Sequence, residues 1–298
     1  MKKLSNEQYL NARNFLLYSA RPLEGSIFKY EFESGDVEDI IENLKKYQNE
    51  DGGFGKGLEP DVRYEGSSVL ASTIALQHLS KINSEKKLEL VKDSFNFLKK
   101  TFNNDECGWE NVPKEVVSAP RAIWWEYDGV HHQWGNPNAE ILGYFYEYPD
   151  LIEPEFKELV TNKAIDYLNN VSDLEMHEMY CYYRLSERLP EELNQRILEK
   201  LDNFVDKCVV KEPSERNGYC AVPLNIVKSP SSSYFAKYAD VIPYDLDQLI
   251  ETQKEDGSWE PNWSWGRYEQ EWEKAREEWK GYITLNNLQI LRSFNRIE

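Results

Sequence analysis

A seven-residue turn motif occurs near the start and again near the end of the chain. It reads QNEDGGF at residues 48–54 and QKEDGSW at residues 253–259. A looser copy, FNNDECGW, lies at residues 102–109, and ERNGY at residues 215–219 is a candidate fourth copy. The aspartate and glycine favour a turn with positive φ, after which the aromatic ring is expected to fold back onto the next helix. A helical hairpin of this kind cannot bury its apolar face alone, so the copies are expected to stack or to close into a ring.

Helical periodicity of two kinds flanks these turns. In the first kind, apolar residues recur on one helix face and charged residues cover the other, at residues 37–47, 88–102 and 193–208. The second kind carries small and apolar residues on most faces, at residues 66–79, 137–146 and 281–294. Helices of the second kind belong inside a larger assembly. Because no comparable segment alternates as a strand does, the sequence predicts an all-α fold.

An amphipathic helix, the Q-x-x-D-G turn with its aromatic residue and a helix rich in small residues together resemble the repeat of squalene and terpene cyclases and of protein prenyltransferases. The resemblance covers the three clear hairpins around residues 48–54, 102–109 and 253–259. It implies an α-α toroid, in which inner helices surround a central cavity and outer helices surround the inner ones. On this resemblance we expect one toroid domain over residues 1–298, built from about five to six helical hairpins.

The balance of charge limits the classes of partner. The 298 residues include 53 acidic and 35 basic side chains, for a net charge of −18. An acidic surface repels nucleic acid phosphates and anionic lipid headgroups, so neither partner is expected. No apolar run reaches the ~20 residues that span a bilayer. Residues 1–7 are polar and lack the apolar stretch of a signal peptide, so a cytoplasmic location is expected.

Cysteines and nucleotide motifs give no sign of a metal or cofactor. The four cysteines are scattered, without metal-ligand spacing, at Cys107, Cys181, Cys208 and Cys220. We expect them to be reduced, buried apolar groups. The chain contains no phosphate-binding loop and no dinucleotide-binding glycine motif, so neither a metal nor a cofactor is expected.

The first candidate site follows the first turn, at residues 55–63. Glu59 and Asp61 flank a proline that favours extended backbone, in which side chains two residues apart point the same way. Paired carboxylates suit general acid–base catalysis, so these two are the catalytic candidates and Arg63 is a candidate for orienting a ligand. The alternative is a helix start that carries acidic groups, with Arg63 as their local partner.

Three segments that follow the turns are expected to be irregular, at residues 103–136, 209–230 and 254–280, the last with room for a short helix at residues 268–279. In a toroid they are expected to gather on one rim, and long loops are often functional. They contribute the remaining ligand-binding candidates, which are Arg121, Trp124, Trp125, His131, His132, Trp134, Asn136, Trp263 and Trp265. Indole faces stack on sugar rings and cations, and histidine exchanges a proton near neutral pH. The alternative is that the rings plug the rim of the toroid.

The catalytic and metal-binding motifs of the families that this chain resembles are incomplete or absent here. The terpene cyclase acid motif D-x-D-D has its nearest counterpart in DVED at residues 36–39, which departs at the third position and lies at a helix start. The prenyltransferase zinc site needs a cysteine two residues after its aspartate, and here Arg63 follows Asp61. The magnesium-binding run D-D-x-x-D is absent.

Two functions therefore remain open from the sequence. The first is an enzyme-like toroid that holds a small organic ligand in its central cavity, with a neutral hydroxylated ligand such as a carbohydrate favoured by acidic groups beside tryptophans. The second is a binding or scaffold protein that recognises a glycan, a peptide or a protein partner without catalysis. The sequence does not choose between them, and it does not indicate an oligomeric state.

Overall fold

The computed structural model describes residues 1–127, 129 and 133–298. These residues form α-helices, short 3-10 helices and loops, and the only β pairings among them are isolated bridges. The all-α prediction is therefore confirmed for the described part of the chain. The fold consists of two compact units, unit 1 with residues Met1–Leu44 and Val209–Glu298, and unit 2 with residues Lys45–Cys208. The arrangement of both into one toroid domain stays a prediction.

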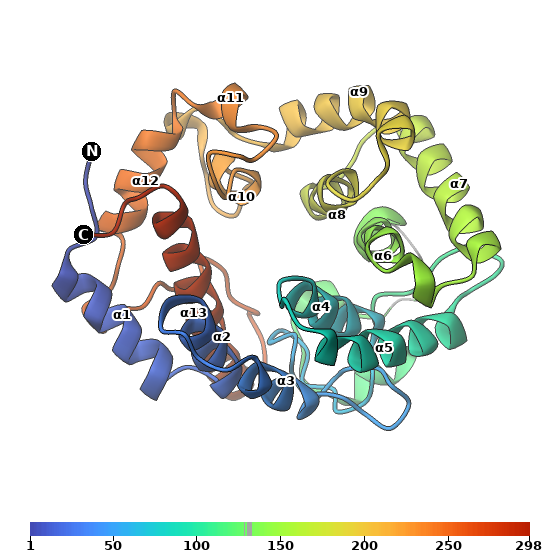
Figure 1. Ribbon diagram of the computed structural model, residues 1–298, viewed down its shortest axis with the longest axis horizontal. Helices are drawn as coiled ribbons and strands as arrows, with labels where there is room; N and C mark the ends of the chain where they lie inside the picture. Colours follow the sequence, from blue (N-terminus) through green and yellow to red (C-terminus); the bar gives the residue numbers. More distant parts are fainter. Residues whose placement is uncertain (128, 130–132) are drawn as a thin grey trace. The chain divides into compact units, whose positions relative to one another are not determined.

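Unit 2 is built from three helical hairpins (Figure 1). Its helices are α4 (Val69–Ser80), α5 (Leu88–Thr101), α6 (Gly135–Glu147), α7 (Pro154–Asn170), α8 (Met176–Ser186) and α9 (Glu191–Cys208). Helix α6 packs between α4 and α8, and each of these three helices packs against the helix that follows it in the chain. The unit therefore has an α4–α6–α8 layer covered by α5, α7 and α9.

The two kinds of helix predicted from the sequence occupy these two layers. Helices α4 and α6 bury most of their residues, whereas α5 and α9 bury one face only. Ser68 caps the start of helix α4, because its side chain accepts the N–H of Ala71 in the first turn. The small residues of α4 and α6 allow this close packing on several sides.

Five 3-10 helices lie in the connections of the chain. They are η1 (Glu85–Lys87), η2 (Lys114–Ser118), η3 (Ile123–Trp125), η4 (Pro149–Leu151) and η5 (Pro213–Glu215). Helices η2 and η3 both belong to the loop between α5 and α6, whose other described residues are in neither an α-helix nor a 3-10 helix, as expected.

Unit 1 combines both ends of the chain. Its helices are α1 (Asn6–Tyr18), α2 (Pro22–Phe32), α3 (Val37–Lys45), α10 (Pro223–Ile226), α11 (Phe235–Tyr238), α12 (Ile242–Glu251) and α13 (Glu269–Ser293). Helix α1 packs against α2 and α13, and Leu4 forms a parallel bridge with Ile297 near the termini. The buried Arg296 donates to the carbonyl of Lys2 and pairs with Asp247. These contacts join residues 1–44 to residues 209–298.

Helix α13 is longer than the sequence indicates. Residues 269–280, expected as a loop with at most a short helix, are continuous with the helix expected from Gly281 onward. A Cβ at Gly281 would lie 2.9 Å from the Cβ of Ala20, so glycine is needed here for close packing inside a helix. The glycine marks a close approach of α13 to the connection between α1 and α2, and not a helix start.

The two full copies of the turn motif share their internal hydrogen bonds. The glutamine Nε2 donates to the glycine carbonyl, at 3.3 Å in residues 48–54 and 3.0 Å in residues 253–259. The aspartate Oδ1 accepts the N–H two residues later, at 3.0 Å in both copies. The φ angles are 88° at Gly52 and 86° at Gly257, a region that strains other residues. The predicted turn is confirmed at both places.

The aromatic residue of three turns is tied to the helix that follows it. The backbone N–H donates to a buried side chain, from Phe54 to Ser72 Oγ at 3.0 Å, from Trp109 to Asn138 Oδ1 at 3.1 Å, and from Trp259 to Thr284 Oγ1 at 3.1 Å. The two indoles also donate to the preceding helix, at 2.6 Å to the Leu98 carbonyl and 2.8 Å to the Leu249 carbonyl. We call these groups the aromatic clamps, because each ties the aromatic residue of a turn to the helix that follows it.

The candidate fourth copy at residues 215–219 has no such clamp, because Tyr219 is 51% exposed.

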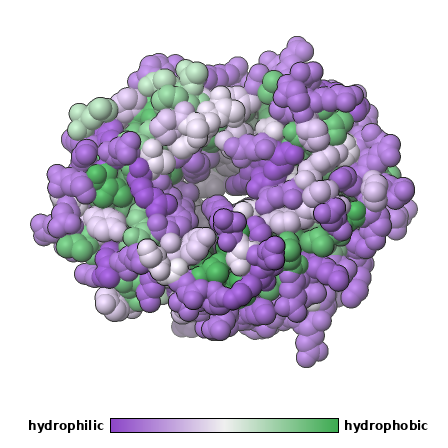
Figure 2. Space-filling model, in the orientation of Figure 1, coloured by the Kyte–Doolittle hydropathy of each residue, from purple (hydrophilic) through white to green (hydrophobic). Residues whose placement is uncertain are grey.

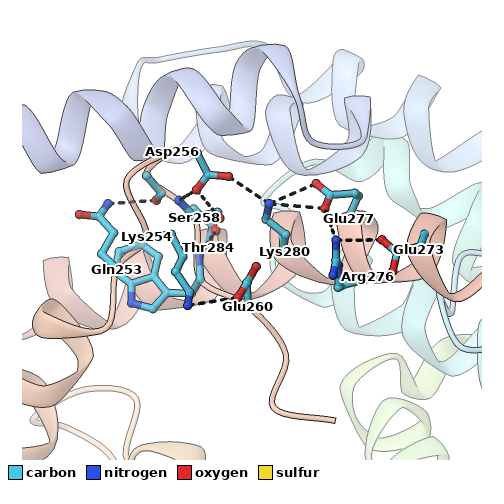
Figure 3. A network of polar contacts seen from close by, with 12 residues as sticks. Gln253, Lys254, Asp256, Ser258, Glu260, Glu273, Arg276, Glu277, Lys280 and Thr284 are labelled. Atoms are coloured by element: carbon cyan, nitrogen blue, oxygen red, sulfur yellow. Dashed lines mark hydrogen bonds and ion pairs between the residues drawn. The ribbon is translucent and has the colours of Figure 1, made fainter. Parts of the chain in front are cut away.

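In the turn at residues 253–259, an ion pair supports the clamp. Figure 3 shows Lys280 of α13 with its Nζ 3.0 Å from Asp256 and 3.2 Å from Glu277. Helix α13 is thus held to this turn by Thr284 and Lys280 together.

Polar residues cover most of the visible surface. Figure 2 shows hydrophilic residues over most of one face and hydrophobic ones in small separate areas. No helix in the described residues is both long and apolar enough to cross a membrane.

Candidate functional site

The acidic segment at residues 59–63 lies against the loop that carries Arg121. The N–H of Arg63 donates to the Pro120 carbonyl at 2.9 Å, and the N–H of Ala122 donates to the Asp61 carbonyl at 2.9 Å. Val62 and Arg121 form an antiparallel bridge between these two hydrogen bonds. The structure therefore brings together two candidate segments that lie far apart in the sequence.

Both candidate carboxylates are buried. Glu59 is 6% exposed and Asp61 is 3% exposed, although most carboxylates in proteins remain in water. The N–H of Val62 donates to the Glu59 carbonyl at 3.1 Å, so residues 59–62 form a tight turn. Both residues make further interactions within the protein. The alternative of a helix start is excluded, because the next helix, α4, begins at Val69.

The arginines of this region hold backbone in place. Arg121 is 4% exposed, its Nη1 donates to the carbonyls of Val116, Val117 and Ala119, and its Nη2 pairs with Glu126. Arg63 donates through Nη2 to the Pro60 carbonyl at 2.7 Å. These bonds fix the loop beside the carboxylates, and a role of either arginine in orienting a ligand stays a prediction.

The tryptophan pair of η3 presents one ring to solvent and one to the protein. Trp124 is 46% exposed. Trp125 packs against the hydrophobic cluster formed by Val62, Leu70, Val112 and Val116, and its buried Nε1 has no hydrogen-bond partner among the described residues. An open indole face thus lies in the same loop that pairs with the acidic segment.

Trp134 and Asn136 lie at the start of α6. Trp134 is 5% exposed, donates through Nε1 to the Cys107 carbonyl at 3.1 Å and packs against Tyr167. Asn136 lies near Cys181, whose Sγ is 3.7 Å from its Oδ1. The ligand-binding roles predicted for both stay predictions, and His131 and His132 lie outside the described residues.

Glu178 of α8 fixes the start of α6. Its Oε1 accepts the N–H of Gly135 and the hydroxyl of Tyr167, both at 2.8 Å. Burial raises the pKa of Glu178, and the two hydrogen bonds partly oppose that rise. The carboxylate anchors the end of the loop that carries the tryptophans.

The remaining candidates, Trp263 and Trp265, belong to unit 1. Trp265 is 3% exposed and packs against Trp272 with ring centroids 5.8 Å apart. Trp263 is half-buried and contacts Tyr219 and Trp279. A common rim shared with the loop of unit 2 stays a prediction.

Sequence reasoning missed a polar network inside unit 2. Glu140 of α6 is 2% exposed and accepts from Tyr144 at 2.7 Å, Arg184 at 2.9 Å and Gln77 at 3.2 Å. Burial and the Glu140 charge raise the pKa of Tyr144 well above its ordinary value, so the hydroxyl stays protonated and donates. The only signal in the sequence was a charged residue within an otherwise apolar helix. Because donors from α4, α6 and α8 saturate this carboxylate, it acts as a structural link.

The thiols of Cys107, Cys181 and Cys208 are held in the protonated form. Burial raises the pKa of Cys208 to about 11, raises the pKa of Cys181 well above its ordinary value and also raises that of Cys107. A thiol with a raised pKa is a poor nucleophile at neutral pH. Among the described residues, no group of three or more His, Cys, Asp or Glu side chains is placed to hold a metal ion.

A surface pocket of about 380 Å³ lies beside the first turn and α5, and none of the candidate residues lines it. No protein-family model and no curated protein matches the chain.

Proposed function

We propose that the chain is an α-α toroid of the kind found in squalene and terpene cyclases and protein prenyltransferases. The repeated turns support this proposal, because three of them clamp their aromatic residue in the same way onto the following helix. The layered hairpins of unit 2 support it as well. All four cysteines are free, which suits the reducing cytoplasm in which we place the protein.

We further propose that the toroid is an enzyme that binds a small neutral hydroxylated molecule, such as a sugar, at the segment 59–63. One observation carries this proposal, namely that Glu59 and Asp61 are both buried in one short segment whose neighbouring loop exposes Trp124. An exposed indole provides a stacking face for the C–H side of a sugar ring. A net charge of −18 disfavours an anionic substrate.

In hydrolysis, one of the two carboxyl groups would act as the general acid and the other as the general base. The protonated one donates its proton to the leaving-group oxygen, and the ionised one removes a proton from the attacking water. The burial of both groups supports this division, because burial disfavours the charged form of a carboxyl group. Arg121 would keep the Trp124 loop at the correct place through its backbone hydrogen bonds.

Thermal unfolding with a panel of mono- and oligosaccharides tests binding. We expect one sugar class to raise Tm, and we expect Trp124→Ala to reduce the binding affinity about tenfold through loss of the stacking face. Tyr18→Ala is the matched control, because Tyr18 is 79% exposed and lies in unit 1. Equal shifts in both variants would contradict the proposed site.

Turnover of the sugar class so identified tests catalysis. Glu59→Gln and Asp61→Asn should each lower kcat by at least about a hundredfold, while the wild-type rate follows a bell-shaped pH profile. A ligand that binds but is turned over by none of the proteins would refute the enzyme and favour the second function.

The second function, recognition of a partner without catalysis, has an observation of its own. The same loop exposes Val117, Ile123 and Trp124 at 53%, 62% and 46%. Neighbouring exposed apolar residues are typical of interaction surfaces. In that case Val117→Ser and Ile123→Ser would abolish binding of the partner, whereas the carboxamide variants would leave it unchanged.

A further inference from the structure

The candidate fourth copy of the turn motif contains the only asparagine–glycine pair of the chain, Asn217–Gly218. Both residues are exposed and belong to a loop of unit 1. The turns at residues 48–54 and 253–259 carry an aspartate before their glycine, and a clamp ties each of them to the helix that follows. At residues 215–219 the acid is replaced by its amide, in a turn that lacks the clamp.

Glycine leaves the backbone nitrogen of residue 218 accessible. A Cβ built at Gly218 would meet no described atom within 4 Å, so neighbouring groups do not crowd this position. The φ angle of Gly218 is 63°, and a residue without a side chain changes its backbone angles here with little restriction. The nitrogen can therefore approach the side chain of the residue before it.

The side chain of Asn217 is held only weakly. Its Nδ2 donates to the Glu215 carbonyl at 3.2 Å, in a bond that is exposed to water. Water replaces an exposed hydrogen bond of this kind at little cost. The Cγ atom of Asn217 is thus able to turn toward the Gly218 nitrogen, with which it can close a succinimide ring.

We propose that Asn217 is a site of spontaneous modification, at which a succinimide converts asparagine into aspartate and isoaspartate. The Gly218 nitrogen attacks Cγ of Asn217, the new N–Cγ bond forms and the Cγ–Nδ2 bond breaks. Nδ2 leaves as ammonia, with the proton that the Gly218 nitrogen loses. Water then opens the ring, at the N–Cγ bond to give aspartate or at the bond to the backbone carbonyl carbon to give isoaspartate. No atom is oxidised or reduced, and water is the only co-reactant.

The modification weakens the attachment of this loop to α12, which depends on the residue before Asn217. Arg216 donates to the carbonyls of Val210 and Lys211 at 3.1 Å and 2.7 Å, and its Nη1 and Nη2 lie 2.5 Å and 3.2 Å from the carboxylate oxygens of Asp245. Asp245 is 5% exposed, so it depends on this guanidinium as its partner. Both products place a new carboxylate beside Arg216, and isoaspartate also lengthens the backbone there. This inference does not rest on the proposed function, because no ligand and no residue of the segment 59–63 takes part.

Storage of the native protein, followed by digestion and mass spectrometry, tests the proposal. We expect the peptide that contains Asn217 to gain the mass difference between a carboxamide and a carboxyl group. The rate should be at least about tenfold higher than at Asn83, which is also exposed in a loop but precedes Ser84 instead of glycine. It should increase with pH, because the attacking nitrogen must lose its proton. An isoaspartate-specific methyltransferase should label the stored protein and not the fresh protein.

A synthetic peptide of residues 212–222 gives the rate without the fold. We expect the folded protein to react within about fivefold of the peptide, as an exposed loop does. A rate at Asn217 no higher than at Asn83, or far below that of the peptide, would overturn the proposal, because the fold would then keep the nitrogen away from Cγ.

Asn217→Gln is the matched control, because the longer side chain closes the corresponding ring far more slowly. Storage should lower Tm of the unaltered protein by about 2 °C or more and leave Tm of the variant unchanged. Equal losses of Tm in both proteins, or no loss in a fully modified sample, would overturn the weakened attachment through Arg216. Circular dichroism spectra of the two fresh proteins should coincide, since position 217 is exposed.

Discussion

Asp256 shows how one residue of the repeated turn stabilises unit 1. Burial raises the pKa of this carboxyl, but hydrogen bonds from Ser258 and the ion pair with Lys280 outweigh that effect, so the pKa lies below its ordinary value. The carboxylate is therefore bound more favourably in the folded state than in the unfolded chain. The same contacts explain why an aspartate occupies this position of the turn.

The lowered pKa predicts a pH-dependent effect of Asp256→Asn. A carboxyl whose folded pKa is depressed contributes stability above its unfolded pKa, here near 3.8, and loses that contribution as the pH falls through the folded value. Urea unfolding should show that the variant is less stable than the unaltered protein at pH 7 and that the difference shrinks below pH ~3.8. Glu255→Gln, at an exposed position of the same turn, should have no such effect. A difference that persists unchanged at pH 3 would contradict the role of the charge.

At the scale of elements, the helices were predictable and the clamps were not. Periodicity of 3.6 residues marks both kinds of helix because each buries a defined set of faces. The residues that complete the clamps, Ser72, Asn138 and Thr284, differ in chemistry and lie 18, 29 and 25 residues after their aromatic partners. Neither type nor spacing repeats, so a sequence pattern cannot reveal them. The three-dimensional position alone is conserved between the hairpins.

The candidate site was also predictable only in part, because its contacts between distant segments leave no repeating pattern in the sequence. Glu59 and Asp61 stood out because two acidic residues flank a proline next to a turn. Their pairing with the loop at residues 120–122 has no periodic signal, because it consists of two backbone hydrogen bonds and one bridge. Glu140 was missed because a single charge in an apolar helix does not indicate how many donors surround it.

The clamps predict a measurable cost for losing one acceptor. Thr284→Val leaves the N–H of Trp259 buried without a partner, which should lower the free energy of unfolding by about 1–3 kcal/mol. Thr73→Val is the matched control, because the Thr73 hydroxyl is equally buried but donates only to the Val69 carbonyl of its own helix. It should cost less than about 0.5 kcal/mol. Equal losses in both variants would mean that burial, and not the clamp, determines the effect.

At the scale of the whole molecule, the chain passes between the two units twice. Residues 45–208 of unit 2 are inserted between the two parts of unit 1. The first crossing lies at the C-terminal end of helix α3, and the second follows directly after α9. The proposed toroid requires the two units to form one body.

Small-angle X-ray scattering tests this expectation. A single compact body of 298 residues should have a radius of gyration of about 19 Å, whereas two units that move independently and only touch would give about 23 Å. Light scattering on the same sample gives the molecular mass, which is 35.1 kDa for the monomer. If the mass is that of an oligomer, the measured radius of gyration is compared with the value expected for that oligomer. The unfolded protein in denaturant should have a radius of gyration of about 60 Å, which is the upper reference value. A pair-distance distribution with two maxima at monomer mass would contradict a closed toroid. A single maximum near the compact value would support the proposed toroid.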